Sequence, residues 1–184
     1  KDKLSLELIL VIFPELKNVK IFSKLNVSNK NLLKKNDFVF LLSLMIIDGT
    51  DNMDYFLYKF NISKKDQKRL KNIDNFYKEK VNSKTFTENN MNKTFYYCGK
   101  QSTIDILNHR LVKLNKEDSA LKELVKHYEI MDTPVMPINA DFLMKKYEIS
   151  EGRQLGEKLK IIEKEWVKNN FKISDHQVEN IINN

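Results

Sequence analysis

The chain has 184 residues, 41% of them hydrophobic, which is enough to bury one large core or two small ones. Four glycines and three prolines are too few for the turns of an all-β sandwich, and Leu, Ile, Lys and Glu recur at helical spacing, so an all-α fold is predicted. The single Cys98 excludes an internal disulfide, and no signal-peptide pattern or apolar run of ~18 residues occurs, so we expect a cytoplasmic protein with no membrane partner.

The net charge of +7 is unevenly distributed along the chain. Residues 1–86 carry 17 basic and 10 acidic side chains, whereas residues 87–184 carry 15 of each. Within the first part, residues 59–84 hold nine basic side chains against three acidic ones. A local basic excess is typical of proteins that bind the phosphate backbone of nucleic acids, so RNA is a candidate partner.

The first 60 residues are expected to form short helices separated by turns. The first of these helices is apolar on most faces, so we expect it to be buried, and Pro14 ends it. Asn and Lys dominate residues 26–36, which we interpret as a linker, and Asp48-Gly49-Thr50-Asp51 predicts a turn. The expected helices span residues 3–13, 15–25, 37–47 and 53–60.

The next helix is the most clearly amphipathic element. Ser63 and Asp66 form a capping-box pattern, so the helix is expected to run from Ser63 to about Lys80, with Leu70, Ile73 and Tyr77 on its apolar side. The opposite side carries a lysine ribbon that we predict to bind RNA phosphates. The alternative is a solvated outer face. The ribbon consists of Lys64, Lys68, Lys71 and Lys78.

The second half is also expected to be helical, after a loop or boundary at residues 82–98. Helices are predicted at residues 100–114, 118–131, 140–147 and 151–170, followed by one that starts at Ser174. The predicted capping residues are Asp118, Asn139, Ser150, and Ser174 together with Gln177. Two helical subdomains follow from this pattern, residues 1–82 and residues 83–184.

A glycine hairpin is expected between the short helix at residues 140–147 and the long helix that follows it. It includes Gly152, Arg153 and Gly156. The order of helix, glycine hairpin and long helix directs backbone N–H groups and a helix N-terminus toward one point outside the protein, which suits a phosphate. We therefore predict that these three residues also bind RNA. Alternatively, the two glycines only allow two helices to pack closely.

The sequence contains no pattern that predicts a catalytic centre or a metal site. His109, His127 and His176 are scattered singly, without metal-ligand spacing. The aspartates at positions 48, 51 and 54 lack the spacing of a calcium loop and are better explained by a turn. Cys98 has no activating partner nearby in the sequence, and no nucleophile, phosphate-loop or dinucleotide motif appears.

The region from Pro134 to Phe171 resembles the carboxy-terminal part of the bacterial CCA-adding tRNA nucleotidyltransferase and poly(A) polymerase family. The resemblance rests on the proline entry, the short segment around Asp141, the glycines at 152 and 156, a Leu-rich helix and a closing aromatic residue. It implies the helical neck, body and tail regions, which hold the RNA. The catalytic head of the family has no counterpart here.

The resemblance implies an RNA-binding part of an enzyme of tRNA processing. It would position the tRNA acceptor end for 3′-nucleotide addition by a head that is upstream or on a separate chain, and Mg²⁺ and CTP or ATP would bind that head. The chain alone would then be inactive. The competing hypothesis is a helical protein-interaction module that has lost RNA binding, and an exposed apolar patch in place of a contiguous basic one would distinguish it.

Overall fold

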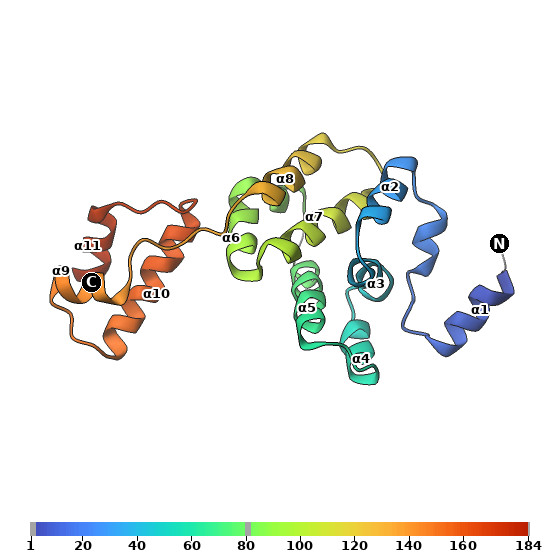
Figure 1. Ribbon diagram of the computed structural model, residues 1–184, viewed down its shortest axis with the longest axis horizontal. Coiled ribbons are helices and arrows are strands. Elements are labelled where there is room, and N and C mark those ends of the chain that lie inside the picture. The colour runs from blue at the N-terminus through green and yellow to red at the C-terminus, as the bar shows by residue number, and fades with distance from the viewer. Residues whose placement is uncertain (1–2, 80–81, 184) are drawn as a thin grey trace.

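The computed structural model describes residues 3–79 and 82–183, and this part of the chain contains helices and no strand. The all-α prediction is therefore confirmed. The helices form two lobes, a larger one made of α1 to α8 and a smaller one made of α9 to α11, and an extended segment after α8 connects them (Figure 1).

The helical elements have the following bounds. In the larger lobe they are α1 (Lys3–Ile12), the 3₁₀ helix η1 (Val19–Ser23), α2 (Val27–Lys35), α3 (Phe38–Ile46), α4 (Asn52–Lys59), α5 (Lys64–Lys78), the 3₁₀ helix η2 (Ser83–Phe86), α6 (Glu88–Cys98), α7 (Lys100–Leu114) and α8 (Ser119–Ile130). In the smaller lobe they are α9 (Ala140–Tyr147), α10 (Arg153–Lys168) and α11 (Asp175–Asn183).

Helix α7 is the centre of the larger lobe, where it packs against α5, α6 and α8. Its side chains Ile106 and Leu107 are fully buried in a core that also takes Ile73 from α5 and Phe95 from α6. Residues from both sides of position 82 thus share this core. The expected boundary between residues 82 and 83 lies within it, and the core cluster of the smaller lobe begins at Met136.

The smaller lobe joins the larger one through α6 and α10. The Tyr96 hydroxyl of α6 donates a hydrogen bond to Glu163 Oε1 of α10 at 2.7 Å. The Tyr96 ring packs edge-on against Trp166, with ring centroids 5.3 Å apart, and Phe171 closes the aromatic cluster. Asn92 Nδ2 donates to Asn170 Oδ1 at 3.1 Å. Aromatic and polar side chains therefore hold the lobes together in addition to the connecting segment.

Two segments expected to be irregular are helices. Residues 27–35 form α2, because the Asn26 side chain caps its N-terminus and Asn29 donates to the Leu111 carbonyl at 3.2 Å. Residues 88–98 form α6, where only Met91 and Phe95 provide a buried apolar pair one turn apart. Both helices depend on contacts with distant parts of the chain. Their polar sequences show little helical periodicity, so the sequence did not predict them.

Helix α1 ends before Pro14 as predicted, but its expected burial is wrong. None of its residues is buried, and Val11 is 78% exposed. The element predicted over residues 15–25 is limited to the short η1. Large apolar side chains of α1 are thus at the surface, namely Leu4, Leu8, Ile9, Val11 and Ile12.

Most predicted caps are confirmed by hydrogen bonds. Side-chain oxygens of Ser63, Asp118 and Asn139 accept from backbone N–H groups three residues later. Ser174 and Gln177 form the reciprocal pair expected for α11. Ser150 is not a cap, because α10 begins only at Arg153. The expected end of the amphipathic helix at Lys80 lies outside the described residues.

Candidate nucleic-acid interface

Helix α5 has the two faces that its sequence predicts. Leu70 and Ile73 are buried in the larger core, and Tyr77 is half-buried and donates its hydroxyl to the Ile106 carbonyl at 2.8 Å. On the outer side, Lys64, Lys68 and Lys71 are exposed. Lys78 is exposed as well, but acidic side chains surround its ammonium group.

Lys78, the fourth lysine of the ribbon, is held in a cluster of carboxylates. Its Nζ lies 2.9 Å from Asp74 Oδ2 and 3.3 Å from Asp54 Oδ2, and Asp51 is 3.7 Å away. The hydrogen bond with Asp74 is the main reason that the pKa of Lys78 is raised well above its usual range. These acids pair with the ammonium group, so Asp51 and Asp54 anchor this lysine and Lys78 links α4 to α5.

A pocket of about 450 Å³ opens beside Lys68, between α5 and the start of α7, and we call it the basic pocket. Its charged lining consists of Lys65, Lys68, Arg69 and Lys100, with Asp37 as the one carboxylate in the lining. The N-terminus of the 15-residue α7 also lies here, where Gly99 has a positive φ of 84°. Helix N-termini carry partial positive charge, so the backbone adds to the field of the lysines.

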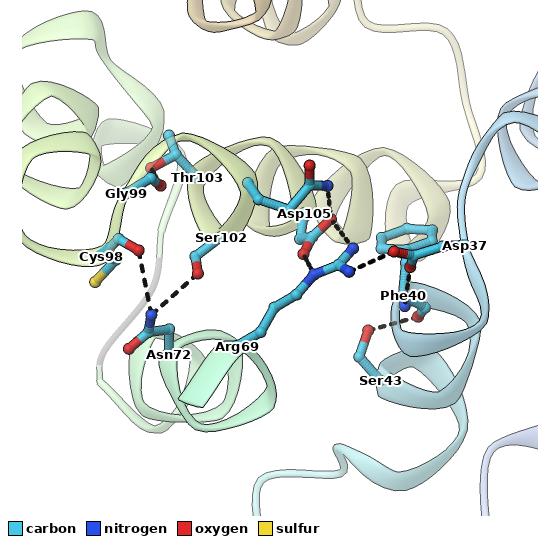
Figure 2. A network of polar contacts seen from close by, with 11 residues as sticks. Asp37, Phe40, Ser43, Arg69, Asn72, Cys98, Gly99, Ser102, Thr103 and Asp105 are labelled. Atoms are coloured by element: carbon cyan, nitrogen blue, oxygen red, sulfur yellow. Dashed lines mark hydrogen bonds and ion pairs between the residues drawn. The ribbon is translucent and has the colours of Figure 1, made fainter. Parts of the chain in front are cut away.

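Arg69 anchors the floor of the basic pocket (Figure 2). Its Nε and Nη2 atoms donate to the two oxygens of the fully buried Asp105, the second at 3.0 Å, and Nη1 donates to Asp37. Burial raises the pKa of the Asp105 carboxyl, and Arg69 acts against this rise. One side chain thereby ties α3, α5 and α7 together, so Arg69 fixes the pocket rather than offering a free charge.

A second set of hydrogen bonds holds the opposite wall of the basic pocket. Asn72 Nδ2 donates to Ser102 Oγ at 3.0 Å and to the Cys98 carbonyl at 3.3 Å, which joins α5 to the junction of α6 and α7. Gln101 Nε2 donates to Asp105 Oδ1 at 3.1 Å. The lysines therefore extend from a rigid frame, which lowers the entropic cost of binding an anion.

The glycine hairpin has only one glycine in the turn. Gly152 precedes α10 with a φ of 150°, whereas Gly156 lies within α10. Arg153 is 92% exposed and pairs with Glu157 Oε1 at 2.7 Å. Helix α10 packs against α6, α9 and α11, while α5 packs against α3, α4 and α7, so the fold puts the two predicted RNA-binding groups in different lobes (Figure 1).

A family model described as a putative tRNA nucleotidyltransferase domain 2 matches residues 32–180. The chain belongs to this family. The match extends from the end of α2 into α11 and includes the basic pocket, and it leaves α1 outside. The resemblance to the helical region of tRNA nucleotidyltransferases is thus confirmed. No curated protein and no solved structure matches the chain.

Within the described part of this tRNA nucleotidyltransferase domain, no group of three His, Cys, Asp or Glu side chains is arranged to hold a metal ion. His109 is fully buried, and His176 Nδ1 lies 3.2 Å from Asn180 Nδ2. Burial raises the pKa of the half-buried Cys98 thiol. No helix of the described residues is long and apolar enough to span a membrane.

Sequence reasoning missed two lysines of the basic pocket in this domain. Lys65 lies next to the ribbon in sequence but turns toward α7, and Lys100 belongs to α7 itself. The sequence signals for the site were Lys68 of the predicted ribbon and the basic excess of residues 59–84. Gly99 allows α7 to begin abruptly after α6. The proximity of α5 to the N-terminus of α7 is a tertiary feature, and helical periodicity contains no information about it.

The position of Gly156 allows a direct test of why glycine occurs there. A Cβ atom added at Gly156 meets no atom within 4 Å, so close packing of two helices does not require this glycine. We expect Gly156→Ala to stabilise the domain by roughly 0.5–1 kcal/mol, because glycine weakens a helix interior. This gain corresponds to a rise in melting temperature of about 1–4 °C for a domain of this size.

Gly152→Ala is the matched control, since its φ of 150° strains any L side chain, and it should melt at a lower temperature than the parent protein. A fall in melting temperature for Gly156→Ala would contradict the open environment of this position. Differential scanning calorimetry of the three proteins makes the measurement.

Proposed function

We propose that this chain is the tRNA-binding helical part of a CCA-adding or poly(A)-polymerase-like nucleotidyltransferase. It positions the tRNA acceptor end for 3′-nucleotide addition by a catalytic head not contained in these residues. The observation that supports this function is the basic pocket, where Lys65, Lys68 and Lys100 line one cavity beside a helix N-terminus. Lys64 and Lys71 of α5 extend the positive surface outside the pocket.

The chemistry of the pocket suits the RNA backbone. Lysine ammonium groups and helix N-termini bind phosphate oxygens without reading the base sequence, and such contacts fix the register of the nucleic acid on the protein. An enzyme that acts on every tRNA requires recognition of this kind. The RNA is therefore held by backbone and shape, and bases contribute only where they are unpaired.

The catalytic head is an additional proposed partner, upstream in a longer protein or on a separate chain. Mg²⁺ and CTP or ATP are proposed to bind that head, and nucleotide addition would then require it. The proposed location of the complex is the cytoplasm.

The experiment is a gel-shift titration of tRNA over a series of salt concentrations. Replacing Lys65, Lys68 and Lys100 with glutamine should lower the slope of log affinity against log salt by about 2, since each lost phosphate contact removes roughly 0.7–0.9. The control replaces three exposed lysines of the smaller lobe, Lys160, Lys164 and Lys172, and should change the slope less. Equal slopes for the two triple variants would exclude the basic pocket as the RNA site.

A second candidate function is favoured by α1, whose apolar side chains are exposed and lie outside the family match. An exposed apolar helix is typical of a surface that docks another protein segment. The two functions make opposite predictions in the same assay. A protein-interaction module without RNA binding would show no tRNA shift at low salt, whereas the proposed RNA-binding domain binds there most tightly.

A further inference from the structure

A second cavity, of about 610 Å³, lies on the other side of α7, where α2, α7 and α8 meet. Leu32, Ile104 and Val125 give it apolar walls, one from each helix. Lys35 and Lys126 also line it, together with the amide of Asn108, and we call it the amide-lined pocket. Its volume is in the range of pockets that bind small molecules, about 300–1,000 Å³.

Asn108 distinguishes this pocket from the other cavities. The residue is only 5% exposed, yet its side-chain amide has no hydrogen-bond partner among the described residues. Other buried asparagines are bonded: Asn29 donates to the Leu111 carbonyl, and Asn52 donates to the carbonyls of Glu15 and Ile46. The amide of Asn108 therefore keeps its donor and its acceptor available to a partner that enters the cavity.

The amide of Asn108 faces the pocket. The unpaired polar atoms of this amide are not completely sealed from solvent. The small exposed part of the residue therefore includes the amide. The cavity that Asn108 lines is the one that a partner of this amide would occupy. That partner must offer an acceptor and a donor side by side, because an amide presents one of each.

A nucleobase has the required chemistry. Its flat faces suit the apolar walls, and the edge of adenine pairs an acceptor with a donor, which an asparagine amide matches with two hydrogen bonds. Lys35 of α2 provides positive charge in the same pocket for the attached phosphate, whereas Lys126 pairs with Glu123 at 3.1 Å and the carboxylate of Glu129 also belongs to the lining. We propose that the amide-lined pocket binds one unpaired adenine nucleotide of the RNA.

The two pockets adjoin at Gln101, which lines both of them. A single strand crossing the N-terminal half of α7 can thus place phosphates in the basic pocket and one base in the amide-lined pocket. This inference rests on the proposed RNA-binding function and adds to it a preference for a single-stranded segment. A base within a double helix cannot enter, because its partner strand covers its edge and its neighbours cover its faces.

The test is titration of the ¹⁵N-labelled protein with AMP, followed through the side-chain amide signals in NMR spectra. We expect the Asn108 amide to shift, and Asn108→Leu to weaken AMP binding at least about tenfold, as expected for loss of two hydrogen bonds. Since the amide has no partner in the fold, Asn108→Leu should melt no lower than the parent protein. Lys35→Gln should weaken binding as well, whereas Lys34→Gln, which changes an exposed lysine outside the pocket, should not.

A short single-stranded oligoadenylate identifies the source of the nucleotide. Displacement of AMP by this RNA, with loss of the effect in Asn108→Leu, supports the proposal. AMP binding that the RNA does not displace would assign the pocket to a free nucleotide and overturn its role in RNA binding. Unchanged AMP and oligoadenylate affinity in Asn108→Leu overturns the site itself, while a retained salt-dependent tRNA shift shows that the proposed function still holds.

Discussion

Replacing Arg69 with methionine is expected to lower the free energy of unfolding by about 3–5 kcal/mol, since it leaves the carboxylate of Asp105 buried without its cation. Asp105 is fully buried and receives two of the guanidinium N–H groups. Chemical denaturation with urea measures the change. The neighbouring Lys68 is exposed, so Lys68→Met is the control and should alter stability by no more than about 0.5 kcal/mol.

The double variant Arg69→Met with Asp105→Leu separates loss of the ion pair from a general packing defect. Replacing a buried pair with apolar side chains is often neutral or stabilising, so the double variant should be more stable than Arg69→Met alone. A loss below about 1 kcal/mol in the single variant would mean that Asp105 is protonated and does not need the arginine.

Acidification is expected to destabilise the larger lobe through His109. This residue is fully buried, its ring centroid lies 4.8 Å from that of Tyr77, and burial lowers its pKa to about 3. The nearby Lys113 lowers the pKa further, while the Ser43 backbone opposes the shift. The unfolded chain takes up a proton near the ordinary pKa of 6.5, whereas the folded chain does so only near pH 3.

Between these values the unfolded state binds one more proton, so stability falls as the pH falls. The slope due to His109 approaches about 1.4 kcal/mol per pH unit below pH 6.5, which amounts to roughly 2 kcal/mol between pH 6.5 and 4.5. In urea denaturation over this range, His109→Leu should lose this part of the slope, and the exposed His176→Gln should keep it. Parallel pH dependences of all three proteins would exclude His109 as the cause.

The sequence predicted those helices that have an apolar face and a capping residue within their own segment. Helix α5 has an apolar side with Leu70 and Ile73 and a local cap at Ser63, and both features are visible within one segment. Helix α2 lacks such a pattern, because its buried side chain is Asn29, whose partner Leu111 is 82 residues away. Propensity and periodicity describe local preferences, and tertiary contacts decide the segments where these preferences are weak.

In the candidate site, too, the features that depend on one helix were predicted and those that depend on tertiary contacts were not. Helical spacing predicted that Lys64, Lys68 and Lys71 share one exposed face, and they are exposed together on α5. It could not predict that Lys78 meets Asp54, since that contact requires the packing of α4 against α5. Nor could it reveal the unpaired amide of Asn108, because hydrogen-bond satisfaction depends on every neighbour in space.

The contact of α6 with α10, and not the connecting segment, sets the relative orientation of the two lobes. Helix α6 contributes Phe95 to the larger core and Tyr96 to the aromatic cluster with Trp166, so consecutive residues of one helix serve both lobes. Residues 132–135 of the connecting segment are mostly exposed. Lengthening this segment changes only the entropy of loop closure, by about 0.6 kcal/mol for each doubling. Insertions here would leave the relative orientation of the lobes intact, whereas rotation of α6 by one residue would separate them.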